Sequence, residues 1–264
     1  MNAQWIDRLR LATAVLTVAA LGPAVMAQPA TDVSASRTVS TGGIVFDGPE
    51  GGPANDDGDT INSTAPTGLF DENAQVHVVA PNGSAELHGH AGQTSNIEFL
   101  APNVVHMTGT LDIDNLFQGL PPSGPDEFAE LHMTSSANLG FEMTTELPVI
   151  YDMKVDYDFD FSGSPALSEA QGFVSAFDVI HEFGLGGFQS LNVSGQVPAG
   201  AQDVSLGIIH GMFDFLTTGE TRATGSMNFD ITARIVPTPA AVGPGLMLLG
   251  GLLLRRRRPT CTHA

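Results

Sequence analysis

The sequence predicts an all-β protein built as an antiparallel β-sandwich of the jelly-roll-like kind. Apolar and polar residues alternate strictly over residues 151–161, which is the two-residue period of a strand with one buried and one hydrated face. Many shorter apolar stretches are separated by glycine- and proline-containing turns, and no long amphipathic segment occurs. The 30 glycines of the chain also fit a turn-rich sandwich.

The N-terminal residues 1–27 have the order of a secretory signal. Two arginines precede an apolar run over residues 11–21, and small residues follow as far as Ala27. At helical rise this run spans roughly 16 Å, about half of a ~30 Å hydrocarbon core, so it is too short for a permanent anchor. We expect a signal helix here, cleavage between Ala27 and Gln28, and the signal-peptide export machinery as a partner.

Residues 28–66 are expected to form one N-terminal strand followed by an acidic loop. The stretch 47–66 is rich in Gly, Asp, Asn and Pro, which favour loops. Within it, Asp56, Asp57 and Asp59 offer carboxylate oxygens of the kind that calcium binds. These aspartates are candidate calcium ligands, and a solvated acidic loop is the alternative.

A single β-sandwich domain is expected over residues 67–236. Its clearest strands alternate at 151–161 and 227–235, and both tyrosines of the chain lie on the apolar side of the first. Further strands, one of them in the preceding segment, are expected at 38–46, 74–80, 85–90, 96–100, 104–111, 130–146, 173–181, 190–197 and 203–215.

One short helix and several turns are expected between these strands. Ser164 and Pro165 are typical of a helix start, which predicts a helix over 166–171. The segments 81–83 and 198–200 combine proline with glycine and predict tight connections.

A candidate transition-metal site lies on the expected strand 85–90. Glu86, His88 and His90 share one face, where side chains two residues apart stand ~6.6–7 Å from each other, so two imidazoles can reach one ion. Polar strand-face histidines that bind no metal are the alternative. A third ligand would come from another histidine of the chain: His77, His106, His132, His181 or His210.

No catalytic residue is assigned from the sequence. A Gly-x-Ser-x-Gly nucleophile motif and a glycine-rich phosphate loop are both missing, and His181-Glu182 lacks the second histidine of a zinc-protease helix. We therefore expect no enzymatic activity and no cofactor, with calcium as the one candidate ligand of the acidic loop.

Between its two terminal signals the chain is strongly acidic. Residues 28–236 contain 28 acidic and four basic residues, a formal net charge of −24. Repulsion from phosphate excludes nucleic acid as a partner. Because this segment contains no cysteine, its stability has to come from burial rather than from disulfides.

The C-terminal residues 237–264 carry a second tripartite signal. An almost wholly apolar segment at 240–254 is followed by four arginines at 255–258, which resist crossing a bilayer and keep the preceding domain facing outward. At helical rise the apolar segment spans roughly 22 Å, so we expect a short transmembrane helix that anchors the protein temporarily. The expected sorting residues are Val236, Pro237, Thr238, Pro239, Arg255, Arg256, Arg257 and Arg258.

This tail resembles the PEP-CTERM sorting signal in the order of its parts, their spacing and the terminal arginines. The resemblance covers about the last tenth of the chain. Thr238 stands where the family usually has Glu, and further residues follow the arginines where many such tails stop. The resemblance implies recognition by an exosortase-like membrane sorting enzyme; a simple C-terminal membrane anchor is the alternative.

These features predict an exported protein that is held briefly in the inner membrane and then reaches the cell surface or the extracellular matrix. The resemblance implies the matrix role, with exopolysaccharide as a candidate partner. Two alternatives stay open: a secreted β-sandwich module that binds a glycan or another surface protein, and a metal-dependent jelly-roll enzyme.

Overall fold

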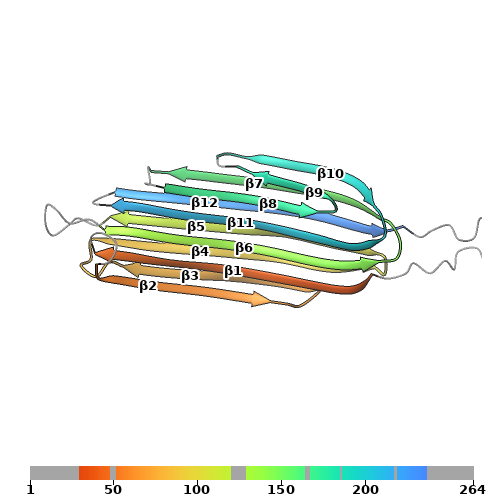
Figure 1. Ribbon diagram of the computed structural model, residues 1–264, viewed down its shortest axis with the longest axis horizontal. Helices are drawn as coiled ribbons and strands as arrows, with labels where there is room; N and C mark the ends of the chain where they lie inside the picture. Colours follow the sequence, from red (N-terminus) through yellow and green to blue (C-terminus); the bar gives the residue numbers. More distant parts are fainter. Residues whose placement is uncertain are drawn as a thin grey trace, which may run out of the picture. The chain divides into compact units, whose positions relative to one another are not determined.

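The computed structural model describes residues 30–47, 52–119, 129–163, 167–184, 186–216 and 219–236, and these residues form two antiparallel six-stranded sheets (Figure 1). The prediction of an all-β sandwich is confirmed. None of the described residues belongs to a helix that could cross a membrane. The helices expected at 1–27 and 240–254 lie outside the described residues.

Sheet 1 has antiparallel neighbours throughout. In spatial order its strands are β2 (Ala54–Ser63), β1 (Thr31–Asp47), β6 (Ala129–Thr145), β11 (Gly200–Leu216), β8 (Leu167–Ala176) and β9 (Val179–Phe183).

Sheet 2 is likewise antiparallel throughout. In spatial order its strands are β10 (Gln189–Val197), β7 (Val149–Ser162), β12 (Gly219–Ile235), β5 (Val104–Gly119), β4 (Ala85–Ala101) and β3 (Gly68–Val79).

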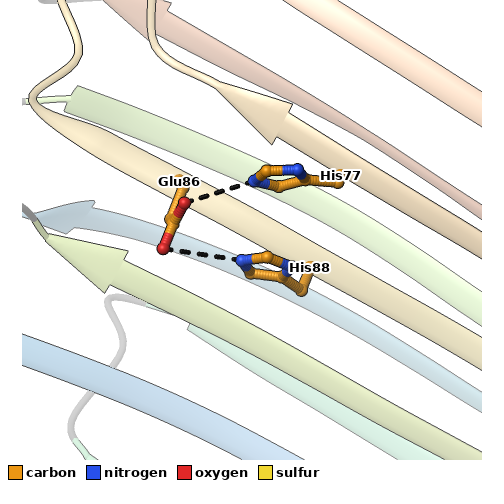
Figure 2. Close-up of side chains that lie close together, drawn as sticks. All are labelled: His77, Glu86 and His88. Atoms are coloured by element: carbon orange, nitrogen blue, oxygen red, sulfur yellow. Dashed lines mark hydrogen bonds and ion pairs between the residues drawn. The ribbon is translucent and has the colours of Figure 1, made fainter.

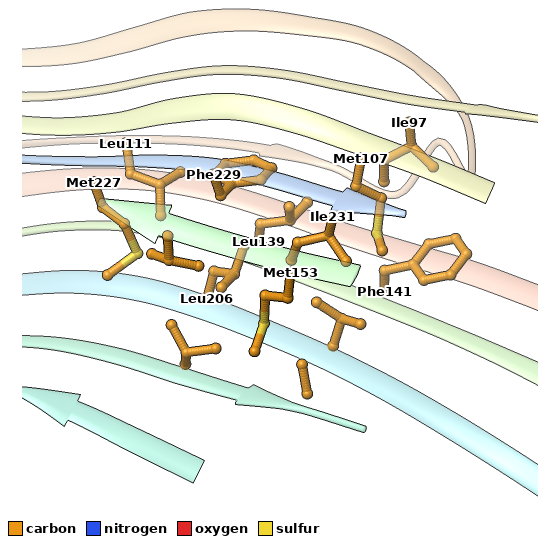
Figure 3. Packing of buried hydrophobic residues seen from close by; sticks show 14 of the residues in the cluster. Ile97, Met107, Leu111, Leu139, Phe141, Met153, Leu206, Met227, Phe229 and Ile231 are labelled. Carbon is orange, nitrogen blue, oxygen red and sulfur yellow. The ribbon is translucent and has the colours of Figure 1, made fainter. Parts of the chain in front are cut away.

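The apolar side chains of both sheets face each other and form the core. Along β7, Met153 and Val155 are buried while the intervening Lys154 is exposed, as the alternation predicts. Figure 3 shows side chains of β5 and β12 packed towards those of β6 and β11. Core residues from both sheets include Ile97, Met107, Leu111, Leu139, Phe141, Leu206, Met227, Phe229 and Ile231.

Both tyrosines of β7 belong to this core. Tyr151 stacks on Phe177 with ring centroids 4.7 Å apart, and Tyr157 stacks on Phe183 at 5.1 Å. Burial raises the pKa of Tyr157 to about 12, which keeps its phenol neutral. The aromatic pairs attach the β8–β9 hairpin to the inner face of β7.

Two local expectations are wrong. The acidic stretch expected as a loop contains β2, which pairs with β1 over residues 54–63, because an edge strand leaves its aspartates hydrated while its backbone groups join the ladder. The helix expected at 166–171 is wrong for its described part, since β8 begins at Leu167 and pairs with β11. Cross-strand pairing there overrides the local capping preference.

Side chains of β2 also cover the neighbouring edge of sheet 2. The amide of Asn55 donates to the carbonyl of Val79 at 2.8 Å, and the backbone N–H of Gln75 donates to Asp59 Oδ2 at 3.2 Å. The accepting carbonyl of Val79 and the donating N–H of Gln75 both belong to the free edge of β3. Side chains of β2 therefore satisfy part of the free backbone edge of β3, which would otherwise attract foreign strands.

A buried arginine secures the connection between the same two edges. Arg37, on β1, is 1% exposed, and its guanidinium donates to the carbonyls of Ala65 and Gly68 at 3.0 Å each. Burial lowers the pKa of this arginine. Its hydrogen bonds fix the path along which the chain leaves sheet 1 and enters sheet 2.

A chain of polar side chains crosses the core from sheet 1 to sheet 2 and back. Thr41 and Ser135 hydroxyls lie 2.8 Å apart, and Ser135 donates to Asn115 Oδ1 at 2.7 Å. The Asn115 amide lies 2.7 Å from His210 Nδ1, and His210 Nε2 lies 3.0 Å from Ser168 Oγ. Only Asn115 comes from sheet 2, so this polar chain specifies how the two sheets face each other.

His210 occupies this chain as a neutral imidazole. Burial lowers its pKa to about 4. The partners assign the tautomer: Nδ1 accepts from the Asn115 amide, and Nε2–H donates to the hydroxyl of Ser168. Protonation would turn Nδ1 into a second donor facing a donor, which the buried site cannot accommodate.

Replacing His210 by Gln is expected to flatten the acid dependence of stability. The folded imidazole stays neutral down to about pH 4, whereas in the unfolded chain it gains a proton near pH ~6.5. The unfolded state therefore binds more protons in this window, so the free energy of unfolding falls as pH falls, by roughly 3 kcal/mol in all. Urea unfolding at pH 7, 5.5 and 4.5 measures the slope.

His181→Gln, which removes a histidine from β9 instead, is the control for this experiment. We expect it to keep the wild-type slope. If the free energy of unfolding of H210Q fell as steeply on lowering the pH as that of the wild type, His210 would not be the group responsible for the acid dependence.

Candidate functional site

The outer face of sheet 2 carries a compact group of imidazole and carboxylate side chains: His77 on β3, and Glu86 and His88 on β4 (Figure 2). Within the part of the chain that the structure describes, this is the one group of three or more potential metal ligands whose ligand atoms lie within 4.8 Å of one another.

The register of the β3–β4 hairpin brings these residues together. His77 is the direct cross-strand partner of His88, and Val79 is the partner of Glu86. Because side chains alternate along each strand, Glu86 and His88 point to the outer face while Leu87 between them is buried. A one-residue slip would move His77 to the opposite face from His88.

The expected turn at 81–83 sets this register. Gly83 has a φ of 74°, a value that a glycine adopts without steric cost, and its N–H donates to the carbonyl of Ala80 at 2.8 Å. The amide side chain of Asn82 accepts from the N–H of Ser84 at 2.8 Å. The prediction of a turn here is confirmed.

The three side chains form a tight, half-exposed cluster. His77 Nε2 lies 3.2 Å from one carboxylate oxygen of Glu86, and His88 Nε2 lies 3.5 Å from the other. The two imidazole rings stack with centroids 4.2 Å apart and an angle of 11° between their planes. Figure 2 shows both Nε2 atoms turned towards the carboxylate.

The histidines also hold Glu86 in its ionised form. The hydrogen bond from His77 lowers the pKa of this carboxyl, partial burial opposes that effect, and the contact with His88 lowers the pKa further. The cluster therefore offers a carboxylate and two imidazoles at one point of the surface.

A shallow depression of about 460 Å³ adjoins the cluster. Arg222 forms a two-pronged ion pair with Asp114, at 2.9 and 2.6 Å, on the far side of this depression. His90 is engaged separately, with its Nε2 2.9 Å from Asp112 Oδ2. The lining residues are Gln75, Val76, His77, His88, Gly89, His90, Asp114, Leu116 and Arg222.

The structure brings His88 to a different partner from the one expected. The candidate metal site on the expected strand 85–90 grouped Glu86, His88 and His90, with histidines that bind no metal as the alternative. In the structure His90 contacts Asp112, and His88 lies with His77 and Glu86. His77 was among the histidines considered for a third position. The other candidates lie elsewhere, with His132 beside Glu130 at 2.7 Å and His210 in the core.

His106 shows why histidine–carboxylate proximity alone does not make a metal site. Its Nδ1 lies 3.3 Å from Glu98 Oε1, and its Nε2 lies 3.0 Å from Asp230 Oδ1. The two carboxylates approach opposite sides of one ring, so they do not converge on a common point with one imidazole nitrogen.

The three candidate calcium ligands lie on β2 rather than in a loop. Asp57 and Asp59 share one side of the strand, and Asp56 points to the other because neighbours alternate. Asp57 Oδ1 accepts from the N–H of Gly58, and Asp59 accepts from the N–H of Gln75. Asp57 and Asp59 thus each accept a hydrogen bond from a backbone N–H.

The predicted sorting and cleavage residues fall beyond the described part of the chain, apart from Val236, which directly follows β12. The others are Ala27, Gln28, Pro237, Thr238, Pro239, Arg255, Arg256, Arg257 and Arg258.

No protein-family model matches the chain, and a search of curated proteins finds no match. Among solved structures, the crystal structure of the infectious bursal disease virus VP2 subviral particle aligns with 88% of this chain and 90% of that chain, at 10% identity and a TM-score of 0.12.

The ionisation of Glu86 tests the geometry of the cluster. We expect the carboxyl carbon of Glu86, followed by NMR, to titrate below the usual range of glutamates, and His77→Ala to shift its pKa upward because the largest favourable hydrogen bond is lost.

His106→Ala is the matched control for this titration, since it removes a histidine from the same face without touching Glu86. A Glu86 pKa that is the same in the wild type and in H77A would contradict the contact.

Proposed function

We propose that the protein is an exported, non-enzymatic component of the cell surface or the extracellular matrix. Its N-terminal signal would be removed after Ala27, and its C-terminal tail would hold it in the inner membrane through a short helix at 240–254 until an exosortase-like enzyme acts on it. The observation that carries the proposal is that the compact folded unit spans Pro29–Ile235, with both signals beyond its limits.

The surface of the folded unit suits a hydrated matrix. Along the outer face of β7, Asp152, Asp158 and Asp160 are exposed, and the segment between the signals carries a formal net charge of −24. Such a surface is strongly solvated and attracts cations and basic groups. An exopolysaccharide matrix in which cations bridge acidic groups is the environment that we propose for it.

A second candidate function is the recognition of a glycan at the depression beside His77. The depression combines hydrogen-bonding groups of Gln75, His90, Asp114 and Arg222 with the apolar Leu116, a mixture that fits sugar hydroxyls and ring faces. Binding of one glycan class on an array, lost in Arg222→Ala, would support this function; a passive matrix protein would show no selective ligand.

Intact-mass analysis of the protein exported by its native host tests the sorting proposal. We expect a mature form that begins near Gln28 and ends near Pro237. Replacement of Arg255, Arg256, Arg257 and Arg258 by Ala should abolish C-terminal processing, because the tail then lacks the charge that stops it in the membrane.

Replacement of the same four residues by Lys is the matched control, since it preserves the charge. Processing retained in the Lys variant assigns the role to charge, and processing lost in it assigns the role to the guanidinium groups. A mature wild-type protein that keeps residues 240–264 would contradict tail removal and leave a plain membrane anchor.

A further inference from the structure

We propose that His77, Glu86 and His88 bind one divalent transition-metal ion of the zinc or copper(II) type on the outer face of sheet 2. This site is independent of the sorting signals and goes beyond the matrix role. It differs from the candidate group of Glu86, His88 and His90 on the expected strand 85–90, because it joins two strands instead of lying along one.

The donor set selects the class of metal. Two imidazole nitrogens and one carboxylate form a ligand set that zinc accepts with a water molecule in the fourth position. Copper(II) binds such nitrogen-rich sites even more tightly. Calcium instead takes six to eight oxygen ligands, which a cluster with two nitrogens out of three donors does not provide.

Two of the three distances between ligand atoms fit this chemistry before any ion is bound, and the imidazole nitrogens of the two histidines lie within 4.8 Å of each other. Ligands ~2.0–2.1 Å from a tetrahedral ion stand about 3.3 Å from one another. The Glu86 oxygens lie 3.2 Å from His77 Nε2 and 3.5 Å from His88 Nε2. An ion would replace the proton that His77 shares with the carboxylate, while small rotations of the half-exposed rings would close the remaining gap.

The fold holds the ligands on rigid elements. His77 and His88 are direct cross-strand partners, and their stacked rings restrict each other to similar orientations. A strongly acidic surface raises the local concentration of cations around the cluster.

The three ligands leave room for an exchangeable one. The side chains of His77 and His88 are 53% and 43% exposed, and both line the depression that also contains Asp114 and Arg222. Water would occupy the fourth position of a zinc ion here.

Zinc titration calorimetry on the exported protein, stripped of metal with a chelator and titrated with zinc chloride, tests the proposal. We expect one zinc ion per chain. His77→Ala and His88→Ala should each weaken binding by at least ~10- to 100-fold, the loss found when even an outer partner of a metal ligand is removed. Glu86→Gln should weaken it as well.

Two variants serve as controls. His106→Ala removes an outer-face histidine that contacts two carboxylates through opposite nitrogens, and His90→Ala removes the histidine next along β4; both should bind zinc like the wild type. Thermal unfolding without zinc should be the same for all variants, since these side chains lie outside the core. Calcium chloride should not displace the ion.

A wild-type protein that takes up no stoichiometric zinc would overturn the proposal. Zinc binding by H77A as tight as that of the wild type would also overturn it. A loss of zinc affinity in H90A as large as that in H77A would overturn it too, because it would place the ion between His88 and His90. None of these outcomes bears on how the tail is processed.

Discussion

The two-residue alternation of side chains along long, in-register antiparallel strands is the constraint on which the rest of this structure depends. Strands such as β4, β6 and β12 continue for 17 residues, so a single register decides the face of many side chains at once. The same rule that buries Leu87 places Glu86 and His88 outside. The core and the candidate site therefore lie on opposite faces of the same strands.

Polar groups determine how the two sheets face each other. Burial of apolar area favours contact between sheets but tolerates sliding, because it has little direction. The chain from Thr41 to Ser168 restricts sliding, since a shift would leave buried donors and acceptors without partners. Arg37 and Asn55 act in the same way at the edge formed by β2 and β3.

The sequence was informative where alternation was strong and misleading where it was weak. The strands containing Tyr151 and Phe229 could be recognised because burial and periodicity coincide. β2 was missed because its Asp, Asn and Gly residues disfavour strands. Its pairing with the preceding strand β1 is not visible in the residue pattern of β2 itself. Ser164 and Pro165 suggested a helix start, yet the residues that follow pair with β11. His88 was recognised as a candidate ligand from the sequence. Its neighbour His77 is placed beside it by the register of the β3–β4 hairpin, which the residue pattern of a single strand does not reveal.

The proposed metal site depends most directly on the register of β3 and β4, and cross-strand contacts between α protons, measured by NMR, determine that register. We expect contacts that pair His77 with His88, Gln75 with His90 and Val79 with Glu86. Contacts that pair His77 with Leu87 or with Gly89 would indicate a slip of one residue. The two imidazoles would then lie on opposite faces, and the proposed metal site would not exist.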